Sequence, residues 1–115
     1  MECHNGTYTD RKEGAIRLMK EINSPAFRMY WQPNQFCDSE ENKKYARLIS
    51  SFTKNIHVFN WNEAARFPLG EAVDLWKEYL SYFNKNQILL LEFMPDDNIS
   101  SLKTEADSLR KITEG

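Results

Sequence analysis

A small set of carboxylate, imidazole and amide side chains recurs along the chain, each at the end of an apolar segment. These residues are Glu2, His4, Gln32, Asn34, His57, Asn60 and Glu92. Glu92 directly follows Leu89-Leu90-Leu91, and a carboxylate buried in such a segment is unfavourable unless it has a partner. A metal ion or a substrate hydroxyl group would be such a partner. Two carboxylates and one imidazole, from Glu2, Glu92 and His57, are ligand types that bind divalent metal ions.

Each of these residues also has a simpler explanation when it is taken alone. Glu92 could be the first exposed residue after a strand, and Glu2 lies at the start of the chain. His57 could be a hydrogen-bonded core histidine, which is more common than a metal ligand. Arg66 could be a loop residue at the surface. The metal-site hypothesis therefore depends on the joint position of these residues at successive strand ends.

Four apolar segments with strand character alternate with four amphipathic segments. We expect strands near 1–4, 27–32, 56–61 and 87–93, each followed by a helix. The clearest helical pattern consists of apolar residues spaced three or four positions apart, namely Leu69, Val73, Trp76, Leu80 and Phe83. The uninterrupted apolar run 88–91 is typical of a parallel sheet that is covered on its faces. This alternation predicts parallel βαβ units.

Capping residues indicate where the helices begin. Asp10, with Glu13 at the capping-box position, predicts the start of the first helix, and Asp38 or Ser39 predicts the start of the second. Pro68 suits the first position of the third helix, where its missing N–H is tolerated.

The fold predicted from these units is an α/β fold, a parallel (βα)4 half of a TIM barrel in one domain, residues 1–115. Right-handed crossovers should keep the strands parallel and in sequential order, with all helices on one face. A complete barrel of eight units needs about 250 residues, and the exposed edges of half a barrel favour aggregation. We therefore expect a fragment of a longer (β/α)8 parent, or a chain that pairs with an N-terminal half-barrel or a second copy. A small self-contained open sheet is the alternative.

Composition and charge exclude several classes of partner. The formal net charge is −2 with both signs interspersed, which predicts neither nucleic-acid nor membrane-surface binding. The longest apolar stretch is far too short to span a bilayer, and no signal peptide is recognisable. Cys3 and Cys37 form no metal-binding or disulfide pattern. These features predict a cytoplasmic protein with reduced thiols.

Four blocks of the sequence resemble the last four strand-and-loop blocks of sugar phosphate isomerases/epimerases of the xylose isomerase-like superfamily. The similarity covers nearly the whole chain in the same order and implies the C-terminal half of a TIM barrel. The blocks are Glu2-Cys3-His4-Asn5, Ile56-His57-Val58-Phe59-Asn60-Trp61, Arg66-Phe67-Pro68-Leu69-Gly70-Glu71 and Leu91-Glu92-Phe93-Met94.

The resemblance implies a metal site and an acid/base pair. Ketose 3-epimerases of that superfamily bind a divalent metal through a Glu, an Asp, a His and a Glu on strands five to eight. Glu2, His57 and Glu92 match three of these ligands, and Gln32 stands on the sixth strand, where a neutral carbonyl oxygen replaces the Asp. The implied cofactor is Mn, Mg or Co. Glu2 and Glu92 would move a proton at a sugar carbon next to a carbonyl.

The resemblance also implies a small-molecule substrate, a sugar or a sugar phosphate. Arg66 matches a loop arginine that contacts substrate oxygens. His4 and Asn60 are further polar candidates at strand ends. Trp31 and Trp61 offer flat faces that suit the C–H surface of a sugar, although core packing explains each of them equally well.

Two other functions remain open at this stage. A catalytically inactive barrel fragment that binds a sugar-like ligand or a partner protein is favoured by the missing Asp. An apurinic endonuclease-like metal hydrolase belongs to the same superfamily, but it would need more His and Asp ligands than this chain offers. The near-neutral charge also disfavours a DNA substrate.

Overall fold

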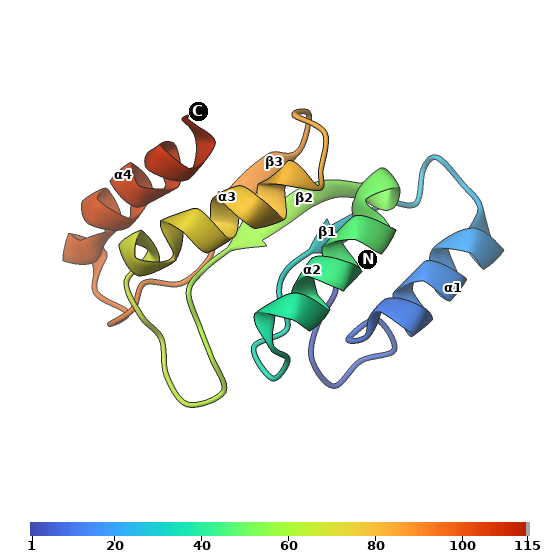
Figure 1. Cartoon of the computed structure of the whole chain (residues 1–115), viewed down its shortest axis with the longest axis horizontal. Coiled ribbons are helices and arrows are strands. Elements are labelled where there is room, and N and C mark those ends of the chain that lie inside the picture. Colours follow the sequence, from blue (N-terminus) through green and yellow to red (C-terminus); the bar gives the residue numbers. More distant parts are fainter. Residues whose placement is uncertain (115) are drawn as a thin grey trace.

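Residues 1–114, which the computed structural model describes, form three strands and four α-helices that alternate along the chain (Figure 1). Short 3-10 turns precede β2, α3 and α4 at Ser50–Phe52, Leu69–Ala72 and Ile99–Ser101. No helix within residues 1–114 has both the length and the apolar character that crossing a bilayer requires. The elements are α1 (Lys12–Ile22), β1 (Met29–Trp31), α2 (Ser39–Ile49), β2 (Thr53–Val58), α3 (Val73–Ser81), β3 (Ile88–Leu91) and α4 (Leu102–Thr113).

The three strands form one parallel sheet in the order β1-β2-β3. Parallel pairing in sequential order is therefore confirmed. The expected first strand, near 1–4, is wrong as a strand: it is reduced to a single parallel bridge between Glu2 and Tyr30. The Tyr30 N–H donates to Met1 O at 2.7 Å, and the Cys3 N–H donates to Tyr30 O at 3.0 Å. The pairing stops there because the chain turns at once into the loop that leads to α1.

The strand expected at 56–61 lies earlier in the chain. β2 begins at Thr53, directly after a 3-10 turn, and it ends at Val58. Residues beyond Val58 belong to a loop in which the Phe67 N–H donates to Asn60 O at 2.8 Å, and Trp61 and Arg66 form an antiparallel bridge. β1 and β3 lie inside the expected ranges 27–32 and 87–93. β3 ends before Phe93, whose φ of 59° is left-handed.

The helix starts agree only in part with the capping residues. Asp38 caps α2 as predicted, since its side chain accepts a hydrogen bond from the Glu41 N–H at 2.8 Å. The predicted cap at Asp10 is wrong: Arg11 occupies that position, and the Asp10 carboxylate instead accepts from the Gly6 N–H at 3.2 Å in the preceding turn. Pro68 lies immediately before the 3-10 turn that leads into α3.

The start of the 3-10 turn that leads into α3 is held by a residue from α4. The Glu105 side chain is buried, and its carboxylate accepts a hydrogen bond from the Leu69 N–H at 3.0 Å. A helix start leaves backbone N–H groups without intrahelical partners, and a carboxylate satisfies one of them while complementing the helix dipole. Glu105 therefore joins α4 to the end of the loop 62–68.

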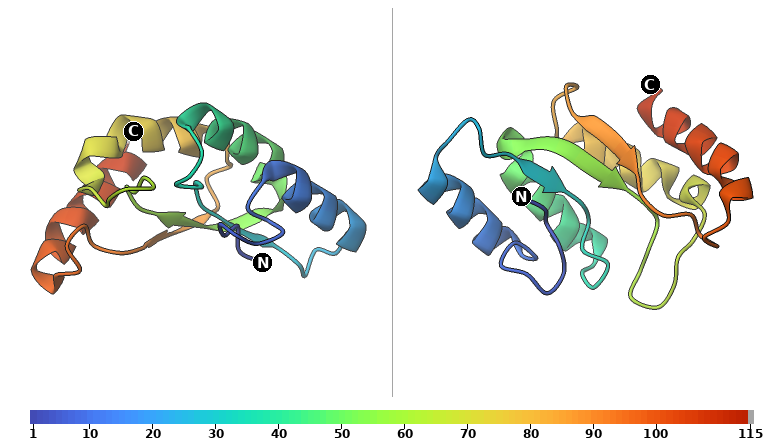
Figure 2. Two further views of the ribbon diagram at one scale, coloured as in Figure 1. Left: turned by 90° about the horizontal axis from the view of Figure 1, so that it is seen from below. Right: turned by 180° about the vertical axis from the view of Figure 1, so that it is seen from behind.

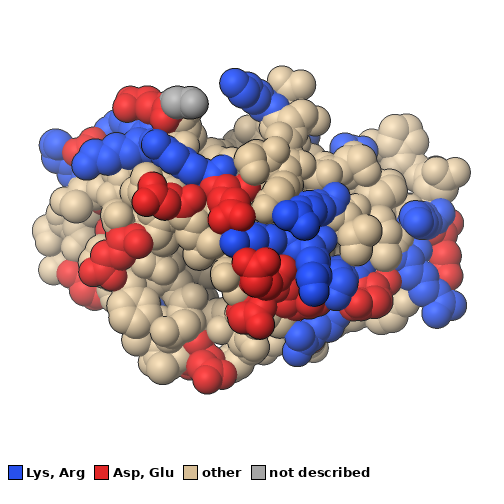
Figure 3. Space-filling view, in the orientation of Figure 1, with Lys and Arg blue, Asp and Glu red and all other residues tan. Residues whose placement is uncertain are grey.

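All four helices lie along one side of the sheet, as Figure 2 shows from two directions. The core between the two layers contains Met29 and Trp31 from β1 and Ile56 and Val58 from β2, all fully buried. Trp31 makes edge-on contacts with Trp76 and Tyr79 of α3, at ring-centroid distances of 6.1 and 5.4 Å. On the helix-covered face drawn in Figure 3, acidic and basic side chains are interspersed.

The opposite face of the sheet has no covering layer within residues 1–114. Successive side chains of a strand point to opposite faces, so Tyr30 faces away from the helices while Trp31 faces them. Tyr30, Ile88 and Leu90 are 37%, 52% and 39% exposed on this open face. An apolar, solvent-exposed face of this kind is typical of a surface that a partner covers.

The two aromatic residues of β1 should therefore differ sharply in their effect on stability. We expect Trp31→Ala to lower the free energy of unfolding by about 3–5 kcal/mol, because it leaves a cavity in the core. Tyr30→Ala, on the open face, should lower it by about 1 kcal/mol or less. Urea unfolding followed by circular dichroism measures both. Equal losses would contradict the assignment of the two faces.

Candidate metal centre

Glu2, His57 and Glu92 come together on the open face of the sheet. One ligand atom from each residue lies within 4.8 Å of the other two. Glu2 comes from the isolated bridge, His57 from the penultimate position of β2, and Glu92 from the position after β3. Residues that are 55 and 35 positions apart in the sequence are thus adjacent at the C-terminal edge of the sheet.

The register of the sheet positions the three side chains. Val58 pairs with Leu91, and the Glu92 N–H continues that ladder by donating to Val58 O at 2.9 Å. Because neighbouring residues alternate between faces, Glu92 and His57 both point away from the helices. Glu2 pairs with Tyr30, which also faces the open side, so the three side chains share one face.

His57 lies at the centre of the cluster. Its Nδ1 atom is 3.6 Å from Glu2 Oε1, 3.5 Å from Glu92 Oε2 and 2.9 Å from Gln32 Oε1. Only the contact with Gln32 is short enough for a good hydrogen bond. The side chains of Glu2, His57 and Glu92 are 45%, 15% and 27% exposed, so solvent reaches the cluster mainly at Glu2. The structure thus places Gln32 beside the three other predicted ligands.

These donor atoms fit a divalent metal ion in type and spacing. Ligand bonds of about 2.0–2.2 Å separate two atoms bound to one ion by about 3–3.5 Å. The distances from His57 Nδ1 to the two carboxylates, 3.5 and 3.6 Å, are close to that separation. Nδ1 can bind an ion only in the tautomer that carries its proton on Nε2. In the other tautomer Nδ1 donates to Gln32, so metal binding and this hydrogen bond exclude each other.

The pKa of the Glu92 carboxyl group is raised above its ordinary value. The main cause is burial, which disfavours the charged form, and the negative charge of Glu2 acts in the same direction. The charges of His57 and His4 oppose the rise. A carboxyl group whose proton is held more tightly, next to a second carboxylate, can exchange a proton with a bound molecule.

An arginine and two aromatic rings contact one another on the loops that follow β2 and β3. The Arg66 guanidinium lies 4.8 Å from the ring centroid of Trp61 and 4.7 Å from that of Phe93, and it forms an ion pair with Asp97. The Trp61 and Phe93 rings are 4.7 Å apart. The left-handed backbone of Phe93 turns the chain immediately after Glu92, and such strain is often found at functional sites.

The structure does not bring every predicted residue to the site. Trp31 as a substrate-binding residue is wrong, because its side chain is fully buried on the helix side of the sheet. The Asn60 amide is used within its own loop, where it donates to Pro68 O at 2.9 Å. His4 Nδ1 lies 2.8 Å from Asn5 O in an exposed turn and acts on Glu92 only through its charge.

Sequence reasoning missed three residues near the site. Tyr30 lies on the open face with its ring centroid 5.3 Å from that of His57. Phe93 and Asp97 contact Arg66. The alternation of Tyr30 with the apolar Trp31 could have placed Tyr30 on the site face. No sequence signal indicates the Asp97 contact, because it joins two irregular loops.

No match to this chain is found among models of protein families, curated proteins or solved structures.

We expect the Glu92 carboxyl to titrate above the ordinary Glu range in metal-free protein. The negative charge of Glu2 raises the Glu92 pKa, so Glu2→Gln should lower the titration midpoint of Glu92. The charge of His57 lowers the Glu92 pKa, so His57→Ala should raise that midpoint. Carbon-detected NMR of the side-chain carboxyl groups measures each midpoint. A Glu92 midpoint that neither substitution moves would contradict the electrostatic contact between the three groups.

The raised pKa of Glu92 also implies that stability depends on pH. The pKa of Glu92 is higher in the folded than in the unfolded protein, so protonation of Glu92 stabilises the fold. This contribution to the free energy of unfolding is fully present below the ordinary carboxyl pKa of about 4.3, and it is lost as pH rises through the pKa of the folded state. Glu92→Gln cannot lose a proton, so the variant should gain stability relative to the wild type between acidic and neutral pH. Urea unfolding of the wild type and the variant, at one acidic and at neutral pH and in the presence of a chelator, measures this change in relative stability.

Proposed function

We propose that this chain is the C-terminal half of a (β/α)8 barrel of the xylose isomerase-like superfamily. Its proposed function is that of a sugar or sugar phosphate isomerase or epimerase, which moves a proton at a carbon next to a carbonyl. The observation that carries the proposal is the convergence of Glu2, His57 and Glu92 at the C-terminal edge of a parallel sheet. Active sites of (β/α)8 barrels lie at that edge.

Glu2, His57 and Glu92, with Gln32 as a neutral oxygen donor, would hold a Mn, Mg or Co ion. Such an ion supplies Lewis-acid chemistry, which polarises a carbonyl group and so acidifies the neighbouring C–H. Gln32 would have to release His57 Nδ1 before that nitrogen could bind the ion. The weaker neutral donor predicts a lower metal affinity than a site with three carboxylates would have.

Glu2 and Glu92 are the proposed acid/base pair. General acid–base catalysis works best when the pKa of the group lies near the working pH. In the metal-free protein burial raises the pKa of Glu92, whereas the charge of a bound ion would lower it. One carboxylate would remove the proton from carbon, and the other carboxyl would return a proton to the opposite face or to the neighbouring carbon. Two carboxyl groups on either side of one imidazole suit this exchange.

The loops after β2 and β3 are the proposed wall of the substrate site. The Trp61 and Phe93 rings would contact the C–H face of a sugar, and Arg66 would contact its oxygens. Arg66 already pairs with Asp97, which leaves its remaining N–H groups for a substrate. The free thiols of Cys3 and Cys37 are compatible with the reducing cytoplasm in which we place this activity.

The proposed activity requires a completed barrel. The open sheet face exposes Tyr30, Ile88 and Leu90, and no strand within residues 1–114 pairs with the outer edge of β3. An N-terminal half-barrel or a second copy of the chain would cover this face and exclude water. Electrostatic stabilisation of a transition state is several times weaker in bulk water than in such an enclosed site.

A catalytically inactive fragment that binds a sugar-like ligand or a partner protein is the second candidate. The neutral Gln32, hydrogen-bonded to His57, favours it, because this contact occupies the nitrogen that an ion would need. An apurinic endonuclease-like hydrolase is less favoured, because the cluster offers a single imidazole and two carboxylates.

Metal binding separates the first candidate from the second. We expect the chain to bind Mn²⁺, and Glu92→Gln to weaken binding by about tenfold or more, since the loss of even a residue that only supports a ligand costs about 10–100-fold. Glu63→Gln, in an exposed loop, is the matched control and should leave binding unchanged. Electron paramagnetic resonance of free Mn²⁺ measures the affinity. Equal weakening by both substitutions would indicate non-specific binding to acidic groups.

Turnover should depend on assembly. We expect monomeric chain to show no ketose interconversion with added Mn²⁺, and activity to arise when an N-terminal half-barrel or a second copy completes the sheet. Glu92→Gln should abolish that activity without changing the molar mass of the assembly. Substrate conversion is measured by chromatography, and the molar mass by light scattering. Robust turnover by a proven monomer would refute the need for completion.

A further inference from the structure

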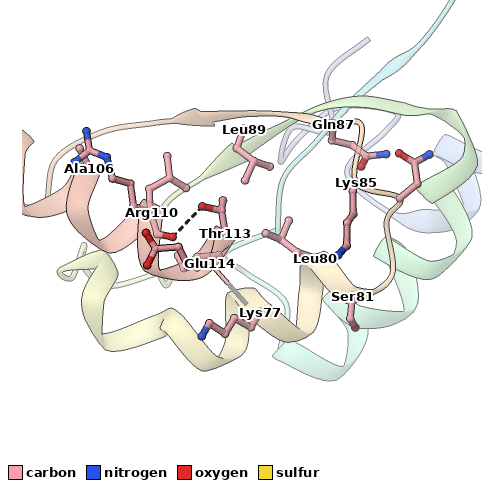
Figure 4. Close-up of a pocket in the computed structure, with 13 residues that line it drawn as sticks. Lys77, Leu80, Ser81, Lys85, Gln87, Leu89, Ala106, Arg110, Thr113 and Glu114 are labelled. Atoms are coloured by element: carbon pink, nitrogen blue, oxygen red, sulfur yellow. Dashed lines mark hydrogen bonds between the residues drawn. The ribbon is translucent and has the colours of Figure 1, made fainter.

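A groove lies between α3 and α4 on the helix side of the sheet, away from the metal cluster. Its cavity volume is about 730 Å³, within the range of roughly 300–1,000 Å³ typical of small-molecule sites. Leu80 of α3 and Leu89 of β3 face one another across it in Figure 4, and Leu109 and Ile112 of α4 contribute further apolar surface. The interior is therefore apolar, as in sites that bind organic ligands.

The groove exists because α3 and α4 approach closely at one end only. Near the start of α3, the Glu105 carboxylate holds the Leu69 N–H, and Ser108 Oγ lies 3.2 Å from the position that a Cβ on Gly70 would take. Toward their C-terminal ends the two helices diverge, as Figure 1 shows. Side chains from both diverging ends line the groove, so it is an opening built into the packing of the helices.

The rim of the groove is basic. Lys77, Lys85 and Arg110 line it, against the single carboxylate of Glu114. Arg110 also pairs with Asp107 at 2.5 Å, but no carboxylate within residues 1–114 forms an ion pair with Lys77 or Lys85. Two lysines beside an apolar interior attract a ligand that carries both a negative charge and an apolar body.

We propose that this groove binds a single-chain anionic amphiphile. The apolar chain lies on Leu80, Leu89, Leu109 and Ile112, and the carboxylate or phosphate group lies at Lys85, while Lys77 adds positive charge elsewhere on the rim. The site lies at the N-terminal end of β3 on the covered face, whereas the metal cluster lies at the other end on the open face. The proposal therefore does not depend on the proposed catalytic function.

The test uses the full chain and dodecanoate below its micelle concentration, followed by amide NMR. We expect shifts confined to 77–89 and 106–113, and binding about tenfold weaker in the double variant Lys77→Glu, Lys85→Glu, as expected when one charge-assisted contact is lost. Lys20→Glu, an exposed lysine on α1, is the matched control and should bind like the wild type. Circular dichroism verifies that each variant is folded.

Two further ligands make the test specific. Dodecyl phosphate should bind at the same residues, and dodecyltrimethylammonium, which has the opposite charge, should not. Shifts centred on Tyr30 and Leu90 of the open face would overturn the proposal. Equal affinity for both head-group charges, or no effect of the double variant, would overturn it too.

Discussion

The alternation of side chains along three parallel strands is the constraint on which the rest of this structure depends. In β1 the fully buried Trp31 lies between Tyr30 and Gln32, and in β2 His57 lies between the buried Ile56 and Val58. Burial of one set under the helices forces the other set onto the open face. A shift of one residue in register would move His57 into the core and Val58 into solvent, so core packing and the cluster specify the same register.

This coupling explains why a cluster of like charges is tolerated at the sheet edge. Two carboxylates beside one another repel, and burial adds a desolvation cost that is visible in the raised pKa of Glu92. The apolar contacts of Trp31 with Trp76 and Tyr79 lie directly behind the cluster and offset that cost. The site is thus held by packing on the opposite face of the same strands rather than by its own contacts.

Much of this arrangement could be predicted from the sequence, because it follows from periodicity. The spacing of Leu69, Val73 and Trp76 predicts a helix there, and the segments between helices predict parallel strands. The positions of Glu2, His57 and Glu92 at strand ends predict that they converge, and their ligand atoms lie within 4.8 Å of one another. When neighbouring strands are parallel and in sequential order, residues at their C-terminal ends must lie at the same edge of the sheet.

Features that depend on irregular backbone could not be predicted in the same way. Asp10 looked like a helix cap, but it accepts from the Gly6 N–H because the turn before α1 competes for the same carboxylate. Trp31 was equally suited to a sugar site or to the core, and only the register of β1 decides between them. The contact of Arg66 with Asp97 joins two loops, where no periodic pattern exists.

The bond between Glu105 and Leu69 has a consequence for the order in which the chain folds. The two residues are 36 positions apart, so the Leu69 N–H, at the start of the 3-10 turn before α3, has no carboxylate partner until α4 has docked. Closing a segment of that length costs entropy before the bond compensates for it. The final conformation of the loop 62–67, which carries Arg66, therefore depends on the docking of α4, and loss of the α4 contacts would release this loop.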